Sequence, residues 1–197
     1  NSVYGLAFNI LGLNRKKLTP TEWLGLIIKA PLFAFKKPPS EKIYAVEADC
    51  DRPGEGRFLA PWLKPAITIW LSVERSHSQN FTALVPKKFP NIESAIAYEF
   101  GYFSAETTDL AIVNGDSEFI VHELGRAQAR IKKITSSDLK RYQPVADHTE
   151  FSTPIENFSV PALLPRETYR SIQATAALTR YWQLDFDPNF VKFIPPP

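Results

Sequence analysis

Two glutamates offer the clearest acid-base chemistry in this sequence. Glu99 lies among aromatic residues, and Glu123 lies in the run His122-Glu123-Leu124-Gly125-Arg126. An apolar wall disfavours the charged form of a carboxyl group and raises its pKa, which suits a general acid. A pair of carboxyl groups can hydrolyse a glycosidic bond. Glu99 and Glu123 are therefore the candidate catalytic residues. The alternative is that both simply belong to amphipathic helices.

The run that begins at His122 also invites comparison with the zinc-protease motif. That motif needs a second histidine one helical turn later, so that two imidazoles on one face hold the metal. Arg126 occupies that position, and a cation cannot ligate zinc. We therefore expect no metal here, and we expect Glu123 to pair with Arg126 or Arg130 at helical spacing.

Composition argues against several other functional classes. Cys50 is the single cysteine, so no internal disulfide can form, and we interpret it as an inert thiol. The 8 glycines do not form a glycine-rich phosphate loop, and we expect no cofactor. The net charge of +2 creates no strong field, so nucleic acid is not an expected partner. No apolar run is long enough to cross a bilayer.

Apolar periodicity and turn residues predict an α+β protein that is mainly helical with a small sheet. The strongest helical patterns cover 116–134 and 166–184, and they should form the scaffold. The other expected elements are helices over 2–12, 20–31, 43–49, 92–100 and 137–142, strands over 66–73, 81–85 and 109–113, and irregular segments over 31–40 and 143–165.

Glycine and proline divide the chain into three parts. Residues 1–50 are expected to form a helical N-terminal lobe, 51–65 a linker or loop, and 66–197 a mixed α+β body. The alternative is a single domain. The sequence contains no methionine and begins Asn1-Ser2, so we expect it to be a processed piece of a longer precursor.

The N-terminal segment contains a well-defined helix start. Thr19 is a good N-cap, Pro20 suits the first helical position, and Glu22 completes a capping box. Trp23 and the apolar residues that follow fall on one helical face, and Pro31 is expected to stop the helix.

This segment, residues 4–31, resembles the C-terminal part of the peptidoglycan glycosyltransferase domain of penicillin-binding proteins. The spacing from Gly12 to Thr19 fits that family without gaps, although other intervals are shorter and Leu11 replaces an expected aromatic. The resemblance covers under a fifth of the chain. Its matches are Tyr4-Gly5, Leu11-Gly12, Leu18-Thr19, Glu22 and Lys29-Ala30-Pro31.

The resemblance implies a lysozyme-like N-terminal part in a cell-envelope (periplasmic) protein. Such a protein would bind or help to assemble glycan strands, with glycan or lipid-linked glycan as its partner and Tyr4, Trp23 and Lys29 as its binding residues. The family's catalytic glutamates lie upstream of the matched segment, so enzyme activity stays open. The alternative is a non-catalytic interaction subunit that contacts a protein partner through the proline-rich segments 31–39, 143–165 and 194–197.

Overall fold

A parallel three-stranded sheet, here called sheet A, forms the centre of the structure. It is described from a computed structural model. Its strands are β1 (Ile67–Trp70), β2 (Leu110–Asn114) and β3 (Arg130–Ile134), with β2 in the middle. All five residues of β2 are buried, as expected for a parallel strand that is covered on both faces. The structure describes residues 3–13, 17, 19–35, 43–75, 78–154 and 157–184.

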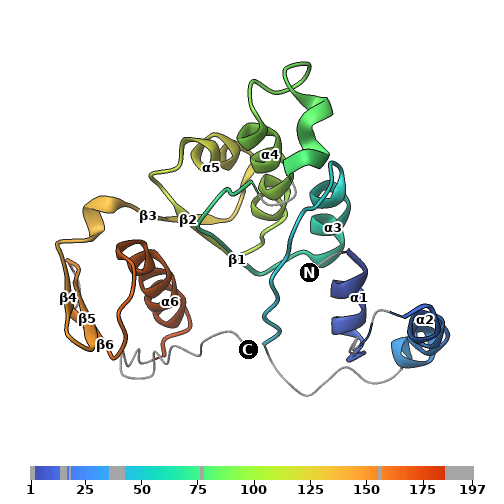
Figure 1. Cartoon of the computed structure of the whole chain (residues 1–197), viewed down its shortest axis with the longest axis horizontal. Helices are drawn as coiled ribbons and strands as arrows, with labels where there is room; N and C mark the ends of the chain where they lie inside the picture. Colours follow the sequence, from blue (N-terminus) through green and yellow to red (C-terminus); the bar gives the residue numbers. More distant parts are fainter. Residues whose placement is uncertain are drawn as a thin grey trace.

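Two helices cover one face of sheet A. Helix α4 (Ile92–Ala105) connects β1 to β2, and α5 (Glu118–Glu123) connects β2 to β3 (Figure 1). Parallel strands need such crossovers, and crossovers of one handedness place both helices on the same side. This side of the sheet has its own apolar cluster, formed by Trp70, Ala97, Ala111, Val113, Ile120 and Leu124.

The other face of sheet A packs against helix α6 (Tyr169–Tyr181) and a second sheet, sheet B. Sheet B is antiparallel and contains β4 (Arg141–Val145), β5 (His148–Ser152) and β6 (Asn157–Val160) in that order. These elements share the largest apolar cluster of the described residues. Its buried members are Leu110, Ile112, Ile134, Phe151, Phe158, Val160, Leu164, Tyr169, Ile172 and Ala174.

Three further helices extend the molecule away from sheet B (Figure 1). Helix α3 (Glu55–Leu63) packs against α4, and α1 (Val3–Ile10) joins the same cluster through Leu6. Helix α2 (Pro20–Ala34) packs on α1 in a separate small cluster around Phe8 and Leu26. Short 3-10 turns complete the described elements: η1 (Ser78–Leu84), η2 (Leu124–Arg126), η3 (Ser136–Asp138) and η4 (Arg166–Thr168).

The predicted α+β class is confirmed, and so are several elements with strong local signals. Asn91 caps α4 as its position suggested, because its side-chain oxygen accepts a hydrogen bond from the Ser94 N–H at 2.8 Å. The Thr19 hydroxyl accepts one from the Glu22 N–H at 3.3 Å, which starts α2. Pro31 does not stop α2, which continues to Ala34 and thereby packs Phe33 into the cluster on α1.

The predicted long helix over 116–134 is wrong. The structure breaks this segment into α5, η2 and β3. Its apolar residues match helical spacing, but the backbone of 130–134 instead pairs in register with the whole of β2. The pairing places Ile134 in the core, and a strand that depends on a distant partner leaves little periodic signal of its own.

The prediction of an irregular segment over 143–165 is also wrong, because β5, β6 and most of β4 lie there. Pro144 argued against a strand, yet β4 lies at the edge of sheet B, where proline is tolerated. Four other expectations differ from the structure. Residues 51–65, which were expected to be a linker or loop, contain α3. Residues 81–85 lie in and after η1, 43–49 form no regular element, and 137–142 divide between η3 and β4.

Candidate functional site

The carboxyl ends of β1, β2 and β3 are joined by a group of polar contacts. Asn114, the last residue of β2, donates a hydrogen bond to the Leu71 carbonyl oxygen after β1 at 3.0 Å. Its side-chain oxygen accepts one from the Asp116 N–H at 3.0 Å. The buried amide therefore fixes the loop after β2 against the end of β1.

Asp116 connects this loop to β3 and to α6. One of its carboxylate oxygens accepts hydrogen bonds from the Ser136 N–H at 2.7 Å and from Arg170 at 3.1 Å. The other accepts one from the Ser136 hydroxyl at 3.2 Å. Three segments that are far apart in sequence therefore meet at one carboxylate.

Gly115 allows the loops after β2 and β3 to approach each other closely. Its N–H donates to the Ile134 carbonyl oxygen at 2.7 Å. A Cβ atom at this position would lie 2.9 Å from the Thr135 methyl carbon, which is closer than real contacts allow. Thr135 and Asp138 form a capping box that orients η3 and directs the chain into β4.

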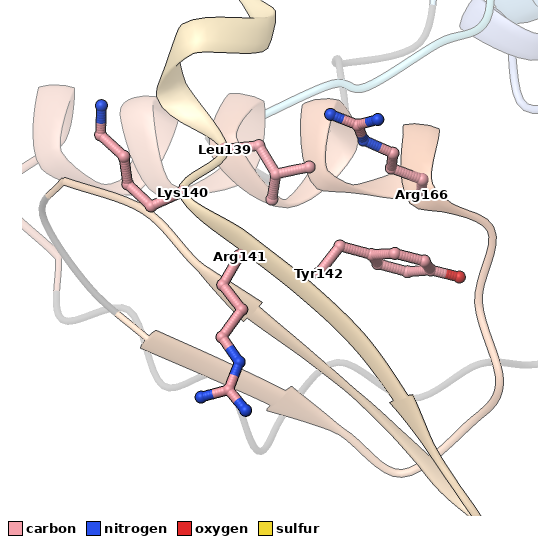
Figure 2. Close-up of a pocket in the computed structure, with 5 residues that line it drawn as sticks. All are labelled: Leu139, Lys140, Arg141, Tyr142 and Arg166. Carbon is pink, nitrogen blue, oxygen red and sulfur yellow. The ribbon is translucent and has the colours of Figure 1, made fainter.

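An open hollow of about 210 Å³ lies beyond η3, where β4 begins and α6 approaches. It is lined by Leu139, Lys140, Arg141, Tyr142 and Arg166. Figure 2 shows that the side chains of Lys140 and Arg166 extend to one side of β4, whereas the Arg141 side chain extends to the other side. Arg141 donates to Gln143 on that second side. Three cationic residues and one aromatic ring therefore line the hollow, and two of the cations, Lys140 and Arg166, lie on the same side of β4.

The walls of this basic hollow are held by hydrogen bonds and packing. The Tyr142 hydroxyl donates to the Leu164 carbonyl oxygen at 2.9 Å, and its ring packs against Phe151 at 5.6 Å between centroids. Leu139, which lines the hollow, donates its N–H to the carbonyl oxygen of Ser136, the partner of Asp116, at 3.2 Å, so the hollow adjoins the edge of sheet A.

Tyr169 lies beside this edge with an unsatisfied polar group. Its side chain is 3% exposed, and its hydroxyl has no hydrogen-bond partner among the residues that the structure describes. Burial raises the pKa of this hydroxyl, which therefore stays protonated and able to donate. The guanidinium group of Arg170 lies over the Tyr169 ring, 5.2 Å from its centroid, which keeps this ring beside Asp116.

The first sequence candidate, Glu99, occupies a structural position at a helix end. It is 6% exposed, and its carboxylate accepts hydrogen bonds from the Gly56 N–H at 3.1 Å and the Arg57 N–H at 3.3 Å. These N–H groups belong to the first turn of α3, which has no other side-chain cap. A carboxylate there satisfies free donors and the helix dipole.

This geometry gives a testable prediction. Replacing Glu99 by alanine should lower the free energy of unfolding by about 1–2 kcal/mol, because two N–H groups of α3 lose their acceptor. Urea denaturation followed by circular dichroism measures the change. Glu74→Ala is the control, since Glu74 is exposed and caps no helix. A stability equal to that of the unmodified chain would contradict the capping role.

The second candidate, Glu123, is buried and forms an ion pair with an arginine whose side chain is 29% exposed. Its carboxylate lies 2.6 Å from Arg126, which confirms the pairing expected from helical spacing. Arg126 also donates to the Tyr98 carbonyl oxygen at 2.7 Å, and its guanidinium carbon lies 4.7 Å from the ring centroid of Tyr98 and 4.6 Å from that of Tyr102. Neither Glu123 nor Glu99 lines the basic hollow, and their catalytic role stays a prediction.

The predicted binding residues of the N-terminal segment do not gather at the basic hollow. Trp23 packs edge-on against Phe8, with ring centroids 5.7 Å apart, and Lys29 is exposed on α2. Tyr4 lies in α1, and its side chain is outside the described part of the structure. The expected contact segment 194–197 also lies outside the described residues.

The described residues also bear on Cys50, metals and membranes. Cys50 is buried, and burial raises its thiol pKa, as do the nearby charges of Glu99 and Glu55. Within the described ranges, no three histidine, cysteine, aspartate or glutamate side chains gather as metal ligands. None of the described helices has the length and apolar character needed to cross a membrane.

Sequence reasoning missed the residues that form the basic hollow. Two of them, Lys140 and Tyr142, lie in 137–142, which was expected to be a short helix before an irregular stretch. A third, Arg166, begins the segment 166–184, which was expected to be a helix. The sequence does contain a signal for the neighbouring edge of sheet A. Asn114-Gly115-Asp116 is a polar turn directly after a buried strand. In parallel sheets this is the edge where ligands bind.

The fold is similar to that of a MurF ligase from Thermotoga maritima, solved in complex with ADP. The two structures superpose with a TM-score of 0.64 at 20% sequence identity. The match covers 96% of this chain and 45% of the ligase, so the chain spans less than half of the ligase's length. No protein-family model matches the sequence, and no curated protein matches it.

This likeness corrects the resemblance to the peptidoglycan glycosyltransferase domain. The matching fold belongs to a MurF ligase, and it includes almost the whole chain rather than residues 4–31 alone. The glycosyltransferase and transglycosylase function inferred from that resemblance is therefore wrong, and nothing shows a lysozyme-like lobe. The alternative of a non-catalytic interaction subunit gains no support. A capping box before an apolar helix occurs in unrelated proteins, which explains the error.

Proposed function

We propose that this chain is part of a ligase and contributes its adenine-nucleotide site. The observation that carries the proposal is the superposition of 96% of the chain on a MurF ligase that was solved with ADP. The polar edge of sheet A and the adjoining basic hollow support it, because they offer the chemical groups that a nucleotide requires.

The position of these groups agrees with a general property of α/β sheets. Ligands of such sheets bind outside the carboxyl ends of the parallel strands. Asn114 and Asp116 follow β2, and Ser136 follows β3, so all three lie at that edge. Asp116 also holds Arg170, which places the start of α6 beside the same edge.

The basic hollow provides complementary chemistry for a phosphorylated aromatic molecule. Lys140 and Arg166 can pair with phosphate oxygens, and charge-assisted hydrogen bonds of this kind are strong. Tyr142 and Leu139 provide an aromatic and apolar wall for a base. The sequence contains no glycine-rich phosphate loop. We therefore assign Lys140 and Arg166 as the groups of this chain that bind the phosphates.

Titration calorimetry with ADP tests this assignment. We expect Arg166→Ala and Lys140→Ala each to weaken ADP binding about tenfold, which corresponds to about 1.4 kcal/mol for a lost contact with a charged group. AMP carries fewer phosphate charges and should bind the unmodified chain more weakly than ADP. In the double variant Arg166→Ala, Lys140→Ala, the difference in affinity between ADP and AMP should become smaller.

Arg52→Ala is the matched control. Arg52 is an exposed arginine before α3, outside the basic hollow, so its loss changes the net charge equally without removing a proposed contact. Undiminished ADP affinity in the Arg166→Ala, Lys140→Ala double variant would overturn the assignment of these cations. Absence of any ADP binding at millimolar concentration would overturn the proposed function itself.

A further inference from the structure

Helix α2 has two apolar faces, and only one of them is covered. Its inner face holds Trp23, Leu26, Ala30 and Phe33, which pack on Phe8, Leu11 and Leu13 of α1 and the following turn. On its outer side, five large apolar side chains are between 58% and 92% exposed. These are Leu24, Ile27, Ile28, Leu32 and Phe35.

The five exposed side chains form one continuous stripe. Successive residues of a helix advance by about 100°, so these five fall within an arc of about 140°. The covered side chains lie on the opposite side of the helix, and Glu22 and Lys29 lie between the two faces. A helix that is apolar all round is normally buried on all sides. An apolar stripe of this kind marks an interaction surface.

The charges around α2 indicate what covers the stripe. Residues 15–37 include six of the 23 basic residues of the chain but only one of its 21 acidic residues. The remaining sequence therefore holds 17 basic and 20 acidic residues. Five of these six basic residues flank this one apolar helix in the sequence, three before it and two after it. That arrangement complements an anionic lipid surface.

The length of α2 determines how it would meet such a surface. The helix has 15 residues and is about 22 Å long, whereas a bilayer core is about 30 Å thick. It is therefore too short to span the bilayer but long enough to lie in the interface. Figure 1 shows α2 beside α1 at the outside of the molecule, far from sheet B.

From these observations we propose that α2 binds in the plane of an anionic membrane surface. The stripe of Leu24, Ile27, Ile28, Leu32 and Phe35 enters the boundary between headgroups and acyl chains. The basic residues at both ends of the helix pair with anionic headgroups. The inner face stays on α1 and keeps the rest of the chain attached to the surface. This proposal does not depend on the nucleotide site.

Vesicle flotation tests the proposal directly. The whole chain is mixed with vesicles of phosphatidylcholine that contain about one third phosphatidylglycerol, and with vesicles of phosphatidylcholine alone. We expect binding to the anionic vesicles, weaker binding to the neutral ones, and release as the salt concentration rises. In the double variant Leu24→Glu, Ile28→Glu, binding to anionic vesicles should fall at least about tenfold.

Leu163→Glu is the matched control, because Leu163 is 62% exposed and lies after β6 rather than on α2. This variant should bind vesicles like the unmodified chain. Thermal unfolding by circular dichroism establishes that the double variant is folded. No binding to anionic vesicles, or equal binding of the double variant, would overturn the proposal. The unmodified chain could instead self-associate without binding vesicles, and the double variant could abolish this self-association. That result would assign the stripe to a second copy of the chain and would also overturn the proposal.

Discussion

Replacing Arg126 by alanine is expected to lower the free energy of unfolding by about 3–5 kcal/mol. The change leaves the Glu123 carboxylate, which is 8% exposed, with only the exposed His122 imidazole as a partner, 3.1 Å away. It also removes the hydrogen bond to the Tyr98 carbonyl oxygen and the contacts of the guanidinium group with the rings of Tyr98 and Tyr102. Chemical denaturation of the two proteins measures the difference.

A second ion pair provides the contrast. Arg75 and Glu93 are also 2.6 Å apart, but the Arg75 side chain is 65% exposed, so Arg75→Ala should change stability far less. The double variant Glu123→Leu, Arg126→Leu should recover part of the loss, because no buried charge then stays unpaired. If Arg126→Ala and Arg75→Ala lower the free energy of unfolding by the same small amount, the pair of Glu123 and Arg126 does not stabilise the contact between α4 and α5.

Gly56→Ala should destabilise the protein by about 3 kcal/mol or more, at the upper end for overpacking. A Cβ atom at residue 56 would lie 2.0 Å from the Glu99 carbonyl oxygen and 2.7 Å from its carbonyl carbon. Both atoms belong to the backbone of α4 and cannot rotate away. Helices α3 and α4 must therefore separate, which also weakens the cap that Glu99 provides. Thermal and urea unfolding measure the loss.

Gly25→Ala is the control for this substitution. Gly25 also lies inside a helix, and a Cβ atom there would meet nothing within 4 Å. Alanine favours the helix over glycine by about 0.5–1 kcal/mol, so this variant should be as stable as the parent or more so. Equal stability of the Gly56→Ala and Gly25→Ala variants would contradict the close approach of α3 and α4.

Elements with strong local signals could be predicted from the sequence. Strand β2 follows from an uninterrupted apolar run that ends in an Asn-Gly turn, and α4 follows from the Asn91 cap. The start of α2 follows from Thr19 and Pro20. These features depend on neighbours within one or two turns, so the order of residues is sufficient.

Other features depended on partners far away in the chain. Strand β3 takes its conformation from β2, and sheet B depends on the pairing of β4, β5 and β6. The carboxylate of Asp116 meets Ser136 and Arg170, which follow 20 and 54 residues later. The interpretation of Glu99 as a general acid did not anticipate that α3 would begin against its carboxylate.

The sequence alone determined the α+β class, the caps of α2 and α4, the central buried strand and the unequal distribution of charge around α2. Only the tertiary structure decided which polar groups meet at the edge of sheet A, and that α2 leaves one apolar face uncovered. The physical reason is that caps and periodicity arise within a few residues. Strand pairing, burial and contacts between charged groups arise between segments that only the folded chain brings together.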